Sequence, residues 1–207
     1  MGFFEWFFGQ EPSIFEQLGH DDKGEYGEFM ITYALEHDNI YGYSKVLKNL
    51  YIPIGYGKTT EIDIILIHRK GIFVYESKNY SGWIFGDESN KYWTQVLKGG
   101  QKNRFYNPIL QNQTHINALS RLLKIDKEKF ISMIIFSKRC ELKKVPSNND
   151  RLMIMKRDYV IDDTNTKVAQ SDEVFTGEEV DEIYNVLEKY TNVNEEIKQK
   201  HIQDLKK

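Results

Sequence analysis

Apolar and polar residues follow different periods along the chain, and each change of period marks an expected element. From residue 24 to 36 apolar residues recur three and four positions apart, which predicts a helix with a stripe of Phe29, Met30, Tyr33 and Leu35. Short apolar or alternating runs between turn residues then predict a series of strands. These strands are expected at 43–52 (ended by Pro53), 63–67, 72–75, 82–85 and 92–97.

The second half of the chain carries clearer helix signals. Asn107 before Pro108 is typical of a helix start, and the apolar spacing extends that helix to about Leu123. A continuous apolar run at 130–136 predicts a buried strand. Further elements are expected as strands at 152–155 and 159–161, a helix from the capping box at Thr176 to Tyr190, and a charged helix or tail at 194–207. This order predicts an α/β fold in which helices flank a mixed sheet.

Two acids and a lysine interrupt the apolar runs. Asp63 stands at the head of one run, and Glu76 and Lys78 close the next. A hairpin of these two runs, joined at residues 68–71, would bring Asp63 close to Glu76, and residues two apart on a strand share one face. Charges are rarely buried unless they are paired or bound to a metal.

Such a pair of carboxylates can hold Mg²⁺ or Mn²⁺, with the Ser77 carbonyl as a third ligand. The cation would polarise a phosphodiester. Lys78 would hold the attacking water or neutralise charge on phosphorus. An acid of the first helix would hold a second cation or a water, and Glu28 is preferred to Glu25 because it lies on the side of the stripe away from residue 36.

The formal net charge is −3, so nothing global indicates a nucleic-acid ligand. Residues 89–104, however, contain four basic residues and no acid, and Lys98, Lys102 and Arg104 are the first candidates for phosphate contacts. The single cysteine excludes an internal disulfide, and the five histidines have no zinc-site spacing. Gln111, in the first turn of its helix, is expected to bind DNA backbone or a metal-bound water.

The first eight residues, MGFFEWFF, are unusually aromatic and are too short to span a bilayer. They have neither the basic region nor the cleavage site of a signal peptide. We expect this segment to dock within the protein or an oligomer, and the alternatives of a partner protein or a membrane interface stay open.

Several short pieces resemble, in order, the NERD (nuclease-related domain) family of the PD-(D/E)xK nuclease superfamily, over residues 23 to 123. The pieces are GEYGE at 24–28, EIDII at 61–65, GIFVYESKN at 71–79, Gly82, Trp93 and NPILQN at 107–112. Ile62 stands where the superfamily motif has proline. The resemblance implies a restriction-endonuclease-like fold, DNA processing, and a catalytic set of Glu28, Asp63, Glu76 and Lys78 assisted by Gln111.

The sequence thus predicts a metal-dependent nuclease that hydrolyses DNA phosphodiesters with Mg²⁺ or Mn²⁺. The alternative is an inactive nucleic-acid-binding or scaffold module of a larger assembly. We expect an aromatic segment at 1–20, a nuclease core at 21–137, and a C-terminal part at 138–207 that completes the same domain. The expected partner is DNA, homo-oligomerisation stays open, and the expected location is the cytoplasm, with docking at a membrane as the alternative.

Overall fold

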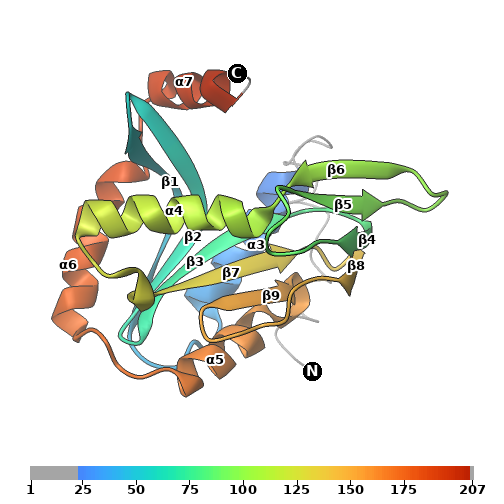
Figure 1. Ribbon diagram of the computed structural model, residues 1–207. Coiled ribbons are helices and arrows are strands. Elements are labelled where there is room, and N and C mark those ends of the chain that lie inside the picture. The colour runs from blue at the N-terminus through green and yellow to red at the C-terminus, as the bar shows by residue number, and fades with distance from the viewer. Residues whose placement is uncertain (1–22, 206–207) are drawn as a thin grey trace, which may run out of the picture.

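A larger β-sheet forms the centre of the molecule and a smaller one lies at its side in a computed structural model, which describes residues 23–205 (Figure 1). The larger sheet contains, in spatial order, β1 (Ser44–Gly55), β2 (Lys58–His68), β3 (Gly71–Lys78), β7 (Phe130–Phe136) and β9 (Leu152–Lys156). The first three strands are antiparallel, and β7 and β9 continue parallel to β3. The sheet is therefore mixed, as the sequence predicts.

The smaller sheet continues from the end of β3 at Lys78. Its spatial order is β6 (Lys102–Tyr106), β5 (Tyr92–Val96), β4 (Gly82–Phe85) and β8 (Cys140–Lys144). The strands β4, β5 and β6 are antiparallel, whereas β8 lies parallel to β4. Because β6 leads directly into the helix that starts at Pro108, this sheet is connected at both ends to the centre of the fold.

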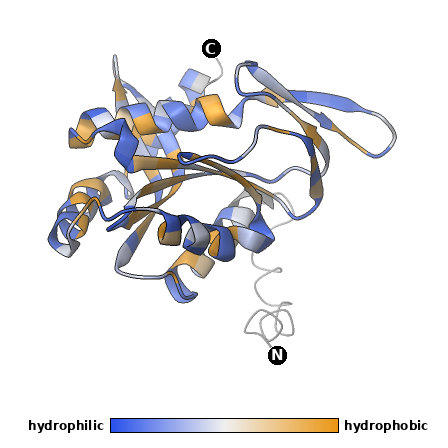
Figure 2. Cartoon of the chain, turned by 60° about the horizontal axis from the view of Figure 1, so that its bottom comes forward, coloured by the Kyte–Doolittle hydropathy of each residue, from blue (hydrophilic) through white to orange (hydrophobic). Residues whose placement is uncertain are grey.

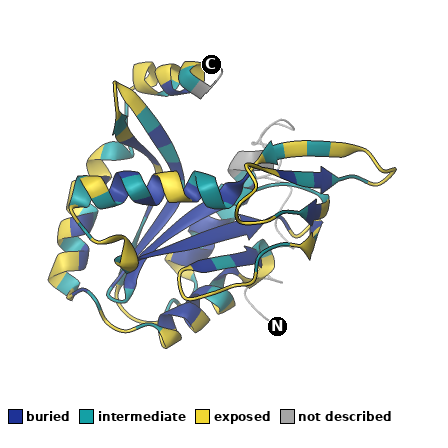
Figure 3. Cartoon of the chain, viewed as in Figure 1, coloured by how far each residue is buried: buried dark blue, intermediate teal, exposed yellow. Residues whose placement is uncertain are grey.

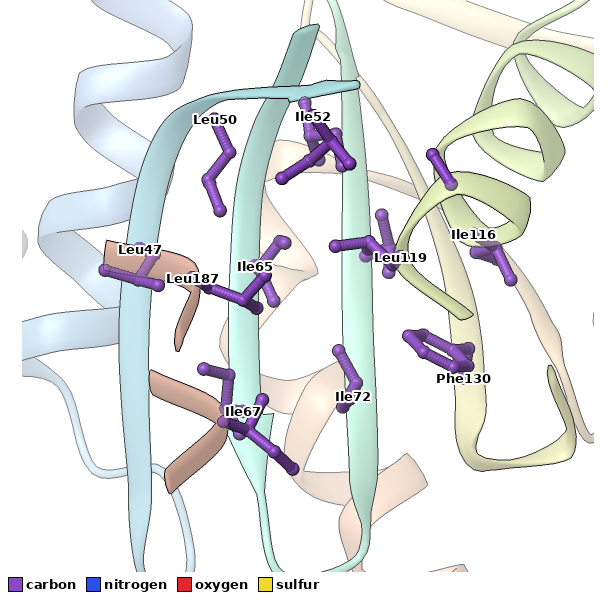
Figure 4. Packing of buried hydrophobic residues seen from close by; sticks show 14 of the residues in the cluster. Leu47, Leu50, Ile52, Ile65, Ile67, Ile72, Ile116, Leu119, Phe130 and Leu187 are labelled. Carbon is purple, nitrogen blue, oxygen red and sulfur yellow. The ribbon is translucent and has the colours of Figure 1, made fainter. Parts of the chain in front are cut away.

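Helices cover both faces of the larger sheet. They are α3 (Lys23–His37), α4 (Pro108–Leu123), α5 (Val160–Gln170), α6 (Gly177–Leu187) and α7 (Glu195–Leu205), with 3-10 turns at 127–129, 157–159 and 188–190. One apolar cluster joins one face of the sheet to α4 and α6, and Figure 4 shows Ile65, Ile72 and Leu119 within it. A second cluster joins the other face to α3 and α5. No helix of the described residues is long and apolar enough to span a bilayer.

Burial is deepest along β3 and β7, as Figure 3 shows. All seven residues of β7 are buried, and the central strands are the most hydrophobic part of the chain in Figure 2. A parallel strand covered on both faces has this continuous apolar pattern. A polar group at the end of such a strand is therefore held by rigid surroundings.

Three local predictions are wrong. Pro53 lies within β1, where it pairs with Thr59, because β1 is an edge strand and needs no amide donor on its outer side. Residues 159–161 are not a strand, because Tyr159 ends a 3-10 turn and Val160 begins α5. On α3 the buried apolar residues are Ile31, Ala34 and Leu35, so of the predicted stripe Leu35 alone is fully buried. The segment 1–20 lies outside the described residues.

Candidate functional site

The strands β2 and β3 separate at Asp63. Their regular pairing ends at Ile64 opposite Tyr75, one step before Asp63 would face Glu76. At this point β2 also reverses its alternation, because Ile62 and Ile65, three residues apart, pack into the same cluster. The amide of Ser77 donates to Oδ2 of Asp63 at 2.7 Å, so the carboxylate replaces a backbone acceptor of the ladder. The expected proximity of the two strand ends is confirmed.

Glu76 and Lys78 point from β3 toward α4, and Glu76 is the more buried, with 1% of its surface exposed. Lys78 Nζ lies 2.6 Å from Oε1 of Glu76 and donates to Oε1 of Gln111 at 3.0 Å. Gln111 reaches this position because Asn107 caps α4 by accepting from the amide of Ile109 at 2.9 Å. The structure therefore brings Gln111 to the lysine end of the cluster.

Sequence reasoning missed His115, which lies one turn beyond Gln111 on α4. Its Nε2 is 2.9 Å from Oε2 of Glu76, and its Nδ1 is 2.8 Å from Oγ1 of Thr60. Only 2% of His115 is exposed. The i, i+4 spacing from Gln111 was the available signal, because two such residues share one helix face. His115 and Lys78 together hold both carboxylate oxygens of Glu76.

Glu28 of α3 approaches from the opposite face of the sheet and is partly buried. Its charge is close enough to raise the pKa of Asp63. Gly27, the residue before it, lies against β3: a Cβ atom at this position would be 3.8 Å from Oγ of Ser77. The side chain of Glu25 lies outside the described residues. The charge of Glu28 therefore acts on Asp63, and its role as a ligand or water-binding residue stays a prediction.

The two carboxylates differ in charge balance. Burial raises the pKa of Asp63 well above its usual range, and the negative charges of Glu76 and Glu28 raise it further. The Ser77 amide and Lys78 act to lower this pKa, but their effect is smaller. Burial also acts to raise the pKa of Glu76, but Lys78 and His115 outweigh it, and the net pKa is lowered. The partners of Glu76 therefore balance its negative charge, whereas the partners of Asp63 do not balance the negative charge of Asp63.

Lys78 carries a positive charge in this setting. Burial alone would lower its pKa, but the attraction of Glu76 and Asp63 is stronger, and the pKa of Lys78 is raised. A lysine with a raised pKa donates hydrogen bonds and neutralises anions, and it does not accept a proton at neutral pH.

The oxygen donors of this cluster suit a hard divalent cation. Lys78 O accepts from the amide of Ser137, which directly follows β7, so by strand alternation the amide and carbonyl of Ser77 both face the Asp63 side. The carboxylates of Asp63 and Glu76 would complete a set of oxygen ligands. Burial first, and then the charges of Glu76 and Glu28, raise the pKa of Asp63, and a bound cation would offset both effects. Among residues 23–205 no group of three or more His, Cys, Asp or Glu side chains is arranged around a metal position, so this set depends on the backbone oxygen.

The candidate phosphate contacts lie in the hairpin of the smaller sheet. Lys98 is in the turn between β5 and β6, and Lys102 and Arg104 are on β6. Trp93 of β5 is fully buried and stacks on Phe136 with centroids 6.1 Å apart. Tyr92, the residue before it, remains 42% exposed.

The mixed sheet with flanking helices, and the acids and lysine where its strands separate, define a protein of the restriction-endonuclease-like class. The model of the nuclease-related domain (NERD) family matches residues 23–137, and the chain belongs to this family. It is 34% identical over 183 residues to an uncharacterized protein of Bacillus anthracis, covering 88% of this chain and 84% of that protein. No solved structure matches the chain at a significant level.

Proposed function

We propose that this protein is a metal-dependent nuclease that hydrolyses DNA phosphodiester bonds at the Asp63, Glu76 and Lys78 cluster. The family supports a nuclease-related function. The observation that carries the proposal is the hydrogen bond from the Ser77 amide to Asp63, because it fixes a carboxylate beside Glu76 where the strands separate. That arrangement leaves oxygen ligands together at the end of a rigid strand pair.

Asp63, Glu76 and the Ser77 carbonyl would hold Mg²⁺ or Mn²⁺, which when bound supplies charge stabilisation for the phosphorane and activates water. Glu76 is held in one rotamer by His115 and Lys78, so it needs no reorganisation to act as a ligand. Glu28 would orient a water from the side of α3.

Lys78 would supply positive charge on the other side of the reacting phosphate. Its ammonium already donates to Gln111 and Glu76, and three donors leave one for a phosphate oxygen or for the attacking water. In hydrolysis the water oxygen bonds to phosphorus and releases a proton to solvent, the bond to the leaving oxygen breaks, and that oxygen takes up a proton from solvent. Lys78 would stabilise the charge that develops on phosphorus during this step.

Plasmid cleavage tests the proposal. Purified protein with Mg²⁺ or Mn²⁺ should nick or linearise supercoiled DNA, and EDTA should stop the reaction. Asp63→Ala and Lys78→Ala should each abolish cutting. Lys167→Ala is a matched control, because Lys167 is also a buried lysine near an acid, 3.8 Å from Asp150. Normal cutting by both site variants would show that the assignment is wrong.

A second candidate is an inactive nucleic-acid-binding or scaffold module. The observation that favours it is that both oxygens of Glu76 already have partners, as in a structural ion pair. This candidate predicts DNA binding without turnover under every metal condition, and calorimetry that detects no metal binding.

A further inference from the structure

The smaller sheet has one face that the core does not cover. Its inner face packs Ile84, Trp93 and Phe105 against the end of β7. On the opposite face, Tyr92 of β5 pairs with Tyr106 of β6. The pair Thr94 and Arg104 lies two residues further along and therefore shares this face. We call this side the outer face, defined by Trp83, Tyr92, Thr94, Val96, Lys102, Arg104 and Tyr106.

Aromatic rings are exposed across this outer face. Trp83 is 49% exposed, and Tyr92 and Tyr106 are each 42% exposed. Tyr92 and Tyr106 meet edge to face with centroids 6.3 Å apart. Trp83 lies opposite Val96, four residues along β5 from Tyr92, so about 13 Å of strand separates the two aromatic positions. The outer face therefore has two separate ring platforms.

Cations accompany each platform. Arg104 lies over the ring of Tyr92 at 4.7 Å, and Lys91 lies over the same ring at 5.5 Å. Lys143 of β8 lies over Trp83 at 5.2 Å, but Glu141, the β8 residue opposite Trp83, pairs with Lys143 and hydrogen-bonds to Trp83, so the cations around Tyr92 are the stronger phosphate contacts. The other acids nearby, Asp87 and Glu88, belong to the turn between β4 and β5 rather than to its strands.

A surface that combines exposed aromatic rings with basic side chains is suited to bind an unpaired nucleic-acid strand. Bases of a single strand stack on aromatic side chains whatever their sequence, and the basic residues between the rings contact phosphates. A duplex would hide its base faces and could not use these rings. The positive charge is local, since residues 89–104 contain no acid while the whole chain has a formal charge of −3.

We propose that the outer face binds single-stranded nucleic acid through Trp83, Tyr92 and Tyr106, with Arg104 and Lys102 on its phosphates. The inference deepens the proposed function, on which it rests, because it names unpaired strands as the substrate class, including the segments that open transiently in a supercoiled plasmid. The chain connectivity supports this: β4 begins four residues after Lys78, and β6 ends five residues before Gln111. A nucleic-acid strand bound to the outer face would therefore lie on a sheet that connects directly to β3 and α4, the elements that carry Lys78 and Gln111 (Figure 1).

Fluorescence anisotropy without metal measures binding separately from cleavage. In EDTA the full chain should bind an oligothymidylate of about 20 nucleotides at least about tenfold tighter than a blunt duplex of equal length. An oligouridylate of that length distinguishes deoxyribose from ribose strands. Tyr92→Thr, which replaces the ring by a residue that also favours strands, should weaken single-strand binding about 5- to 150-fold. Tyr159→Thr, on an exposed tyrosine of a 3-10 turn, is the control and should bind like wild type.

Two further readouts separate stacking and phosphate contacts from a general loss of fold. The oligonucleotide should quench tryptophan fluorescence in wild type and in Trp6→Phe, but not in Trp83→Phe. Arg104→Gln should lower the salt slope of single-strand binding by about 0.7, and Arg121→Gln, on the last turn of α4, should not. Thermal melting of each variant checks that it is folded.

The outcomes are distinguishable from those of the nuclease proposal. Tight single-strand binding that needs Tyr92 and Trp83, with no cleavage under any metal, supports the outer face and refutes the nuclease. Cleavage with equal or tighter duplex binding, unchanged in Tyr92→Thr and Trp83→Phe, refutes the outer face and leaves the nuclease intact. Dimerisation that depends on Tyr92, without binding of any oligonucleotide, also overturns the inference.

Discussion

Neutralising the two central carboxylates should change stability in opposite directions. Glu76→Gln removes the charge that compensates Lys78, 2.6 Å away, and places an amide beside His115. Breaking a buried pair in this way costs about 3–5 kcal/mol. For a chain of this size each kcal/mol corresponds to about 2–4 °C, so the melting temperature should fall by roughly 6–20 °C.

Asp63→Asn should instead raise stability. The amide oxygen of asparagine can still accept from the Ser77 amide, while the repulsion from Glu76 and Glu28 disappears. The pKa of Asp63 is raised in the folded state, so wild type loses stability as pH rises from the ordinary aspartate range through that raised pKa. The gain in Asp63→Asn should therefore be absent at low pH and reach at least about 1 kcal/mol near neutral pH, since one pKa unit corresponds to about 1.36 kcal/mol.

Urea unfolding without metal, at a series of pH values, measures both variants against wild type. The slope of free energy against urea should stay constant, so that the midpoints report stability. If Glu76→Gln and Asp63→Asn shift the midpoint in the same direction at neutral pH, the assignment of a balanced charge to Glu76 and an unbalanced one to Asp63 is refuted.

Three further predictions follow from single contacts. Burial lowers the pKa of His68 below its usual 6.5, so stability should fall as pH drops below about 6.5 in urea titrations of wild type, and less so in His68→Gln. Asn107→Ala should destabilise the fold by about 2 kcal/mol or more in urea unfolding. The substitution removes the cap of α4 and also the side-chain amide that donates to the backbone carbonyls of Asp87, Glu88 and Asn90. Gln111→Ala should slow plasmid cleavage at least about tenfold by releasing Lys78, whereas Gln113→Ala, on the exposed side of α4, should not.

The sequence predicted those parts of the fold whose signals are local. The run at 130–136 is β7 to the residue, and the Asn107 and Thr176 caps start α4 and α6 where expected. The strands β6 and β8 were not predicted because they are short and polar, and α5 was not predicted because its sequence is mostly polar. In α5 the polar residues Thr164 and Asn165 are buried because they bond to distant groups, Thr164 to the hydroxyl of Tyr75 and Asn165 to Asn39 and Tyr41.

The residues of the candidate site also fall into those that sequence patterns predicted and those that they missed. Asp63, Glu76 and Lys78 could be joined from sequence because a tight turn connects their strands. Thr60 and His115 were missed, because the contact of His115 with Thr60 spans 55 residues and its contact with Glu76 spans 39, and only the helix spacing from Gln111 pointed to His115. The reversal of β2 at Asp63 was also hidden, because it depends on pairing with β1, where Asn49 has a positive φ of 54°.

The rate of metal-dependent plasmid nicking by Asp63→Asn tests the central proposal most directly. The variant should stay folded, and Asp163→Asn is its matched control, because burial and Asp162 also raise the pKa of that partly buried acid on α5. With Mg²⁺ or Mn²⁺, wild type and Asp163→Asn should nick DNA at similar rates while Asp63→Asn does not. Equal nicking by all three proteins, or nicking that persists in EDTA, would contradict a metal-dependent site at Asp63.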